Sequence, residues 1–203
     1  MAIVLGCNVF QIAAPEPGLF RLTLAEIATR FDECAKMMAV LMNGAVELAR
    51  ATGPLRLTIA EPNLATPGLK DMTVLRQSIL RVPEFVALRQ EPRFGALHVC
   101  FLDHFKAEPD PRGGGLLYTQ GFADEPFLYT KEYREERLHT GEPRWLVLQH
   151  EVGHALIGKH HVDTDGNLMS EKNKALSITE QQRAKMLRVA GRLAARGRGG
   201  FWH

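Results

Sequence analysis

The sequence lacks the features that mark several large classes of protein. No apolar run in its 203 residues reaches the roughly 18 residues that a membrane-spanning helix requires. Internal repeats of twenty to fifty residues and low-complexity segments are absent too, which excludes solenoids and most disordered chains. Hydrophobic residues make up 45% and charged residues 24%, as in ordinary globular domains. The length suits one domain with a substantial core.

Cysteine is scarce, with only Cys7, Cys34 and Cys100. An odd number at wide spacing predicts no disulfide framework and slightly favours a reducing compartment. The first 18 residues are apolar, but they lack the positive start of a signal peptide, and Asn8 and Gln11 interrupt them. We therefore predict a first strand here. The compartment in which the chain acts is left open. The chain acts in the cytoplasm, is exported by another route, or had a leader that was trimmed.

Neither sign of charge dominates, because the formal net charge is +2. The distribution is uneven, since six cations and no acidic residue follow Gln181, which leaves 19 Lys and Arg against 23 Asp and Glu elsewhere. The body of the chain is thus mildly acidic, and we expect no nucleic-acid partner. The cations of the tail complement the dipole at the end of a helix. We expect the chain to act as a monomer.

The order of predicted elements is that of an α+β fold with a mixed, twisted sheet. Thr23 and Glu26 form a capping box at the start of a long helix predicted over 24–50, which Gly53 and Pro54 follow. Further elements are predicted from apolar periodicity and from Pro and Gly punctuation. They are strands over 55–62, 96–105, 115–120 and 126–131, and helices over 72–90 (broken at Pro83), 143–157 and 178–195, the last capped by Ser177 and Glu180.

Four of the eight histidines lie within residues 150–161. Residues 150–154 read HEVGH, which is an HExxH motif. On a helix, His150 and His154 lie one turn apart on one face, so both rings can bind one metal ion at about 2.0–2.1 Å. Glu151 lies beside them, where a carboxylate can take a proton from a metal-bound water. The motif therefore predicts a catalytic site with one Zn²⁺ ion.

A third ligand is expected beyond the helix, because catalytic zinc usually takes three protein ligands and leaves a fourth position for water. Gly158 can stop the helix, and His160 and His161 follow two and three residues later. Either of these histidines can complete the site, so the two alternatives stay open at this point.

The segment 146–170 resembles the signature of the metzincin zinc peptidases, HExxHxxGxxH followed by a Met-turn. Its glycine, Gly158, falls one residue late. If the helix carries one extra residue, the third ligand is His161, and if only the glycine is displaced, it is His160. The glycine-to-histidine spacing and the short, matrixin-like step from His161 to Met169 favour His161. The resemblance makes Met169 the Met-turn residue, which underlies zinc without binding it.

The resemblance implies a single catalytic domain over 1–203, with an N-terminal subdomain over 1–158 and a C-terminal one over 159–203. The helix over 24–50 would back the sheet, and the last helix would follow the Met-turn. It also implies a zinc-dependent endopeptidase with Glu151 as general base and a peptide substrate bound in extended form along an antiparallel edge strand. By chain order, the candidate edge residues are Gly115, Leu116, Leu117 and Tyr118. No role is assigned to residues 62–93.

Two other interpretations keep the motif. In the first, a carboxylate replaces the third histidine, as in gluzincins or aspzincins, with Asp163, Asp165 or Glu171 as the candidate. The GKHH segment and the absence of a second helical carboxylate motif count against it. In the second, the chain is a non-catalytic, zinc-stabilised binding module. The intact Glu151 counts against that, because a structural site does not need this carboxylate and usually closes its fourth position.

Overall fold

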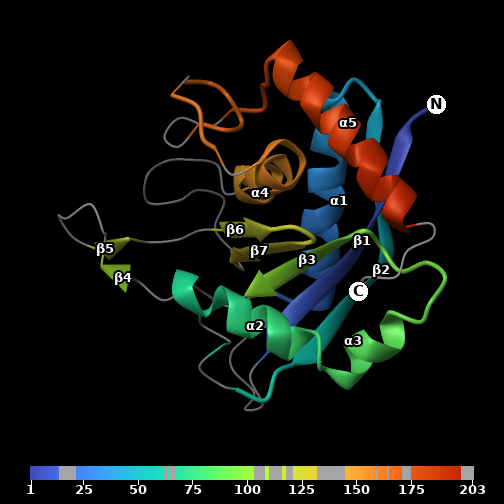
Figure 1. Cartoon of the computed structure of the whole chain (residues 1–203), viewed down its shortest axis with the longest axis vertical. Coiled ribbons are helices and arrows are strands. Elements are labelled where there is room, and N and C mark those ends of the chain that lie inside the picture. Colours follow the sequence, from blue (N-terminus) through green and yellow to red (C-terminus); the bar gives the residue numbers. More distant parts are fainter. Residues whose placement is uncertain are drawn as a thin grey trace.

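A five-stranded sheet lies at the centre of the molecule, with helices on both faces (Figure 1). This computed structural model describes residues 1–13, 22–61, 64, 67–102, 108–109, 116–117, 121–131, 145–158, 160–163, 165–170 and 175–197. The strand order is β2-β1-β3-β7-β6. The strands are β1 (Ile3–Ala13), β2 (Val46–Thr58), β3 (Leu97–Leu102), β6 (Gly121–Asp124) and β7 (Phe127–Lys131).

The sheet is mixed, as predicted, because one strand runs against the other four. β1 pairs in parallel with β2 and β3, and β3 pairs in parallel with β7, whereas β6 is antiparallel to β7. Two further short strands, β4 (Glu108–Pro109) and β5 (Leu116–Leu117), pair with each other in a separate antiparallel sheet.

Each face of the sheet has its own hydrophobic core. The helices α1 (Leu24–Leu41), α4 (Trp145–Ile157) and α5 (Glu180–Gly197) enclose the first core. The second core lies under α2 (Met72–Ile79) and α3 (Pro83–Leu88), which follow the 3₁₀ turn η2 (Leu69–Asp71). β3 is buried on both faces, because alternate residues of a strand point to opposite sides. Helices α2 and α3, which lie within residues 72–88, therefore cover the second face of the sheet.

Helix α1 is shorter than predicted. Its capping box is present, since Glu26 N donates to Thr23 Oγ1 (3.2 Å) and Thr23 N donates to Glu26 Oε2 (2.7 Å). The helix ends at Leu41, however, because Asn43 and Gly44 adopt positive φ angles of 52° and 71°. The predicted end near residue 50 was wrong. The apolar residues that continue the helical spacing belong to the buried face of β2.

The other predicted elements are largely confirmed, with differences at their ends. Pro83 starts α3 and separates it from α2, as predicted. β3 and β7 fall inside the strands predicted over 96–105 and 126–131. Strand β6 was not predicted, because Gly121 and the sequence ADEP (123–126), which overlaps its end, read as loop signals within a strand of only four residues.

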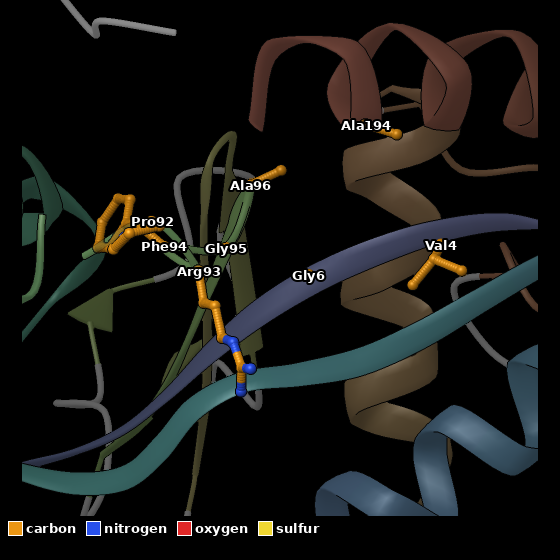
Figure 2. Close-up of a pocket in the computed structure, with 8 residues that line it drawn as sticks. All are labelled: Val4, Gly6, Pro92, Arg93, Phe94, Gly95, Ala96 and Ala194. Carbon is orange, nitrogen blue, oxygen red and sulfur yellow. The ribbon is translucent and has the colours of Figure 1, made fainter. Parts of the chain in front are cut away.

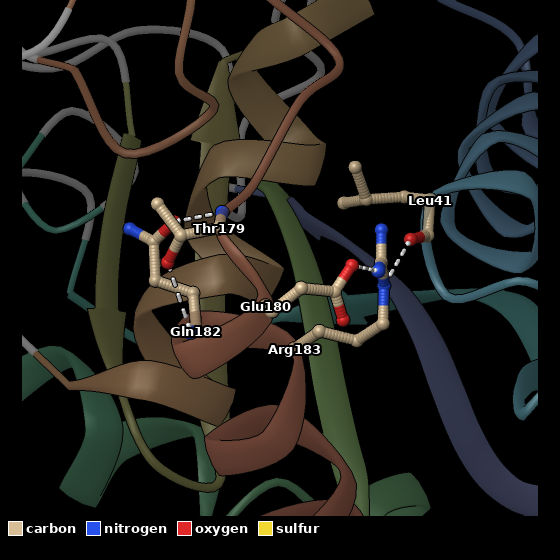
Figure 3. Close-up of polar contacts among 5 residues, drawn as sticks. All are labelled: Leu41, Thr179, Glu180, Gln182 and Arg183. Carbon is tan, nitrogen blue, oxygen red and sulfur yellow. Dashed lines mark hydrogen bonds and ion pairs between the residues drawn. The ribbon is translucent and has the colours of Figure 1, made fainter.

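Helix α5 begins with a capping box that differs from the predicted one (Figure 3). Gln182 N donates to Thr179 Oγ1 (3.1 Å), and Thr179 N donates to Gln182 Oε1 (2.8 Å). The predicted box of Ser177 and Glu180 was thus placed two residues early. Arg183 Nε donates to the Leu41 carbonyl (3.2 Å), which connects α5 to the end of α1. The guanidinium of Arg183 also pairs with Glu180 in the first turn of α5.

The three cysteines are free and buried, as the sequence predicted. Burial raises the pKa of the Cys7 thiol to about 12, so this side chain stays protonated at neutral pH and is a poor metal ligand. Among the described residues, no helix combines the length and the hydropathy that a membrane span needs.

A buried polar cluster joins three strands of the sheet around His98. Asn8 Nδ2 donates to His98 Nδ1 (3.0 Å), and Asn8 Oδ1 accepts from Thr52 Oγ1 (2.8 Å) and Gly95 N (3.1 Å). The His98 ring lies among four phenylalanines and is 2% exposed. Burial lowers the pKa of His98 to about 3, so the ring is neutral in the folded protein.

We expect His98 to make the fold sensitive to acid. The unfolded chain takes up a proton at His98 near pH 6.5, whereas the folded chain takes it up only near pH 3. The free energy of unfolding therefore falls as the pH drops through this window, by up to about 1.4 kcal/mol per pH unit from this group. In His98→Gln, unfolding by denaturant at pH 7.5, 6 and 4.5 should show a shallower fall than in the wild type. Equal slopes in both proteins would contradict the assignment.

Candidate metal centre

Helix α4 carries the HExxH motif and packs against β6, β7, α1 and α5. His150 and Glu151 are each only 5% exposed, His154 is half-buried, and His161 is exposed in the segment after the helix. The motif is therefore held by the core on one side and open to solvent on the other. Such a site can hold its ligands rigidly and still admit a substrate.

The Nε2 atoms of three histidines converge on one point. The distance between these atoms is 3.0 Å from His154 to His150, 3.1 Å from His150 to His161 and 3.2 Å from His154 to His161. Tetrahedral zinc with bonds of about 2.0–2.1 Å separates its ligand nitrogens by about 3.3 Å. Among the described residues, this triad is the group whose ligand atoms lie close enough to share a metal ion.

The other ring nitrogens of the two helical histidines face backbone carbonyls. His150 Nδ1 lies 2.6 Å from the Leu168 oxygen, and His154 Nδ1 lies 3.0 Å from the Gly158 oxygen. A carbonyl oxygen only accepts, so each Nδ1 carries the hydrogen and each Nε2 of the neutral ring presents a lone pair. Lone pairs 3.0 Å apart repel each other unless a cation lies between them. The donor set therefore fits a metal ion, and the carbonyls orient the ligands.

Gly158 follows the last residue of α4 and turns the chain back towards the motif. Its φ of 115° lies in the region that residues with a side chain rarely adopt. Its N–H donates to the His154 carbonyl (2.8 Å), which closes the last turn of the helix. The structure brings His161 to the pair of helical histidines, whereas His160 is exposed and lies outside the group.

The predicted Met-turn residue lies directly beneath α4. Met169 is fully buried, and its Sδ occupies the space that a Cβ on Gly153 of the motif would need. Asn167 Oδ1 accepts from Met169 N (2.8 Å), and Asn167 Nδ2 donates to Gln182 Oε1 (2.9 Å). Asn167 and Gln182 therefore hold the turn, a role the sequence analysis missed because no spacing rule links the two.

Among the described residues, no carboxylate joins the three histidines as a possible metal ligand. Asp163 and Asp165 are exposed and are not members of the group, and Glu171 lies outside the described residues. The acceptors found for His150 and His154 are backbone carbonyls instead of acidic side chains.

The edge of the sheet next to α4 is β6, not the segment predicted by chain order. Leu116 and Leu117 form β5 in the separate two-stranded sheet, and Gly115 and Tyr118 lie outside the described residues. Among the described strands, β6 ends the five-stranded sheet and pairs with β7. The prediction over 115–118 assumed that the next strand along the chain would join the main sheet, and Leu116 and Leu117 do not join it.

A shallow pocket of about 160 Å³ lies elsewhere, at the amino ends of β1 and β3 (Figure 2). Gly6, Gly95 and Ala194 contribute to its walls, and Arg93 is its only ionisable side chain. β1 and β3 approach each other closely here, since a Cβ on Gly95 would come within 2.6 Å of the Gly6 carbonyl. The pocket contains no group suited to acid–base or metal chemistry.

The sequence matches no family model and no curated protein. Among solved structures, a zinc-dependent peptidase from Methanocorpusculum labreanum (strain Z) is similar, with a TM-score of 0.45 and 13% sequence identity. The alignment covers 89% of this chain and 99% of that one.

Proposed function

We propose that this chain is a zinc-dependent endopeptidase whose ligands are His150, His154 and His161. The observation that carries the proposal is the convergence of three Nε2 atoms at 3.0–3.2 Å, with Nδ1 of both helical rings directed at carbonyls. Three histidines leave a fourth position free, as catalytic zinc sites do and structural sites usually do not. An adjacent buried carboxylate, Glu151, supports catalysis over a purely structural role.

Bound zinc would supply a Lewis acid that polarises the scissile carbonyl and lowers the pKa of water. Glu151 is the general base in this proposal. It takes a proton from the attacking water as the water oxygen bonds to the carbonyl carbon, and it returns that proton to the amide nitrogen as the C–N bond breaks. The products are a peptide carboxylic acid and a peptide amine, which ionise to carboxylate and ammonium.

The substrate would lie in extended form beside β6, which is the antiparallel edge strand next to the helix that carries Glu151. A peptide main chain can add to an edge strand through backbone hydrogen bonds. This mode of binding suits protein and peptide substrates in general, because main-chain pairing does not depend on side chains.

A metzincin-type site completes the proposal. In it, Met169 packs beneath the helical histidines without binding the metal, and Gly158 ends the helix so that His161 can return. The segment after residue 158 then acts with the preceding sheet and helix α4 as parts of one catalytic domain. The hydrogen bonds of Asn167 with Met169 and Gln182 support this, because they connect the turn to α5.

Removal of the metal tests the proposal. We expect purified protein to hold about one zinc per chain and to cleave an unfolded protein or a peptide library. Dialysis against a chelator should abolish cleavage, and stoichiometric zinc should restore it, because the ligand set is preserved in the folded chain. Metal content by atomic emission and cleavage by mass spectrometry are the measurements. Full zinc occupancy without cleavage of any substrate would contradict the enzyme and favour a binding module.

A further inference from the structure

The side chain of Glu151 lies against the backbone of the edge strand. A Cβ built on Gly121, the first residue of β6, would come 2.6 Å from Glu151 Oε1, 2.7 Å from its Cγ and 2.8 Å from its Cδ. Real Cβ atoms do not approach other heavy atoms this closely. The carboxylate and the carbons behind it therefore occupy space that exists only because residue 121 has no side chain.

The backbone of Gly121 does not itself require glycine. Its φ lies outside the left-handed region, and the residue pairs with Thr130 in the regular antiparallel register of β6 and β7. An alanine would therefore keep the strand geometry and conflict only with Glu151. That conflict is not relieved by a small rotation of the carboxylate, because Cγ and Cδ are involved and the whole side chain is 5% exposed.

The neighbouring position on the same face of β6 is also small. Ala123 is 8% exposed and belongs to the core that α4 covers, whereas Phe122 packs towards the opposite core. Helix α4 thus packs against two small residues, Gly121 and Ala123, and Gly121, the smaller, is the one beneath Glu151. The contact sets how near the edge strand and the helix lie at the general base.

We propose that Gly121 is a positioning residue for Glu151 and that a side chain at this position displaces the carboxylate from the place where it transfers protons. This inference rests on the proposed function. Gly121 acts through Glu151, whose side-chain atoms are the first that a Cβ at position 121 would meet. It couples the strand proposed to bind substrate to the group proposed to do the chemistry.

The first test compares Gly121→Ala with the matched control Gly191→Ala. Gly191 lies in α5, where a Cβ would meet only Ile3 Cδ1 at 3.9 Å. Gly121→Ala should retain one zinc per chain and lower kcat about a hundredfold with little change in KM, as misplacement of a catalytic group by about 1 Å does. Gly191→Ala should match the wild type. Equal kcat values for both variants and an active wild type would overturn the inference.

The second test does not depend on activity. The free energy of unfolding is measured for Gly121→Ala, Glu151→Ala and the double variant. We expect the loss of stability caused by Gly121→Ala to be much smaller in the Glu151→Ala background, because the methyl group then enters vacated space. Additive losses would overturn the inference. A wild type that binds zinc but cleaves nothing would contradict the proposed function. The unfolding free energies of the three variants would still show whether Gly121 and Glu151 are in contact.

Discussion

Replacing Glu151 with glutamine should leave zinc bound and lower kcat by about 10³–10⁴-fold, the upper range for loss of a general base. Glutamine has the same size, so it fits the space above Gly121 without moving helix α4. The amide cannot take up the proton of the attacking water, and it is not one of the three nitrogens that converge on the metal position. Steady-state cleavage of a fluorogenic peptide and metal analysis of the same sample measure both effects.

The control for this substitution is Glu84→Gln. Glu84 is an exposed carboxylate in the first turn of α3, on the opposite face of the sheet from α4. Glu84→Gln removes the same charge as Glu151→Gln and should leave kcat unchanged. Activity of Glu151→Gln within a few-fold of the wild type would show that another group handles the proton. Loss of zinc from Glu151→Gln would mean that the carboxylate supports the ligand set.

The second large effect is expected at His161. Its Nε2 lies 3.1 Å and 3.2 Å from those of His150 and His154, so His161→Ala removes one of the three proposed ligands. Loss of a partner that merely orients a ligand already costs about 10–100-fold in metal affinity, and loss of the ligand itself should cost more. We expect His161→Ala to bind zinc at least about a hundredfold more weakly and to show no cleavage at micromolar zinc. Competition with a chromophoric chelator measures the affinity.

His160→Ala is the matched control, because it removes the adjacent histidine, which is exposed and outside the triad. This variant should bind zinc as the wild type does. Zinc loss in His160→Ala and not in His161→Ala would reverse the assignment. Full zinc affinity in both variants would favour a carboxylate ligand such as Glu171.

The pairing of His150 with His154 was predictable, because it depends only on the pitch of a helix. The stop at Gly158 was also predictable from local sequence, since glycine readily adopts the positive φ that ends α4. Spacing alone left His160 and His161 open, because the path of the chain after a helix depends on what it packs against. In the structure, the pairing of Val162 with the turn at Met169 holds that segment.

The errors in the predicted fold have a common cause. The helix predicted to residue 50 continued an apolar spacing that β2 also satisfies, and the short strand β6 was missed because it contains the loop signals Gly121 and Asp124. In each case the local pattern suited two structures, and long-range pairing decided between them. β2 pairs with β1, more than thirty residues earlier, and such pairing leaves no local signal.

Local sequence determined the chemistry offered by this protein: two histidines and a carboxylate on one helix, with a glycine stop and two further histidines. Tertiary structure decided which groups meet. It placed His161, and not His160, beside the two helical histidines. It also directed the Nδ1 atoms of His150 and His154 to carbonyls and set Glu151 against Gly121 of a strand thirty residues away. The reason is physical, because a helix fixes contacts within one turn, whereas contacts between a helix and an edge strand depend on how the whole core packs.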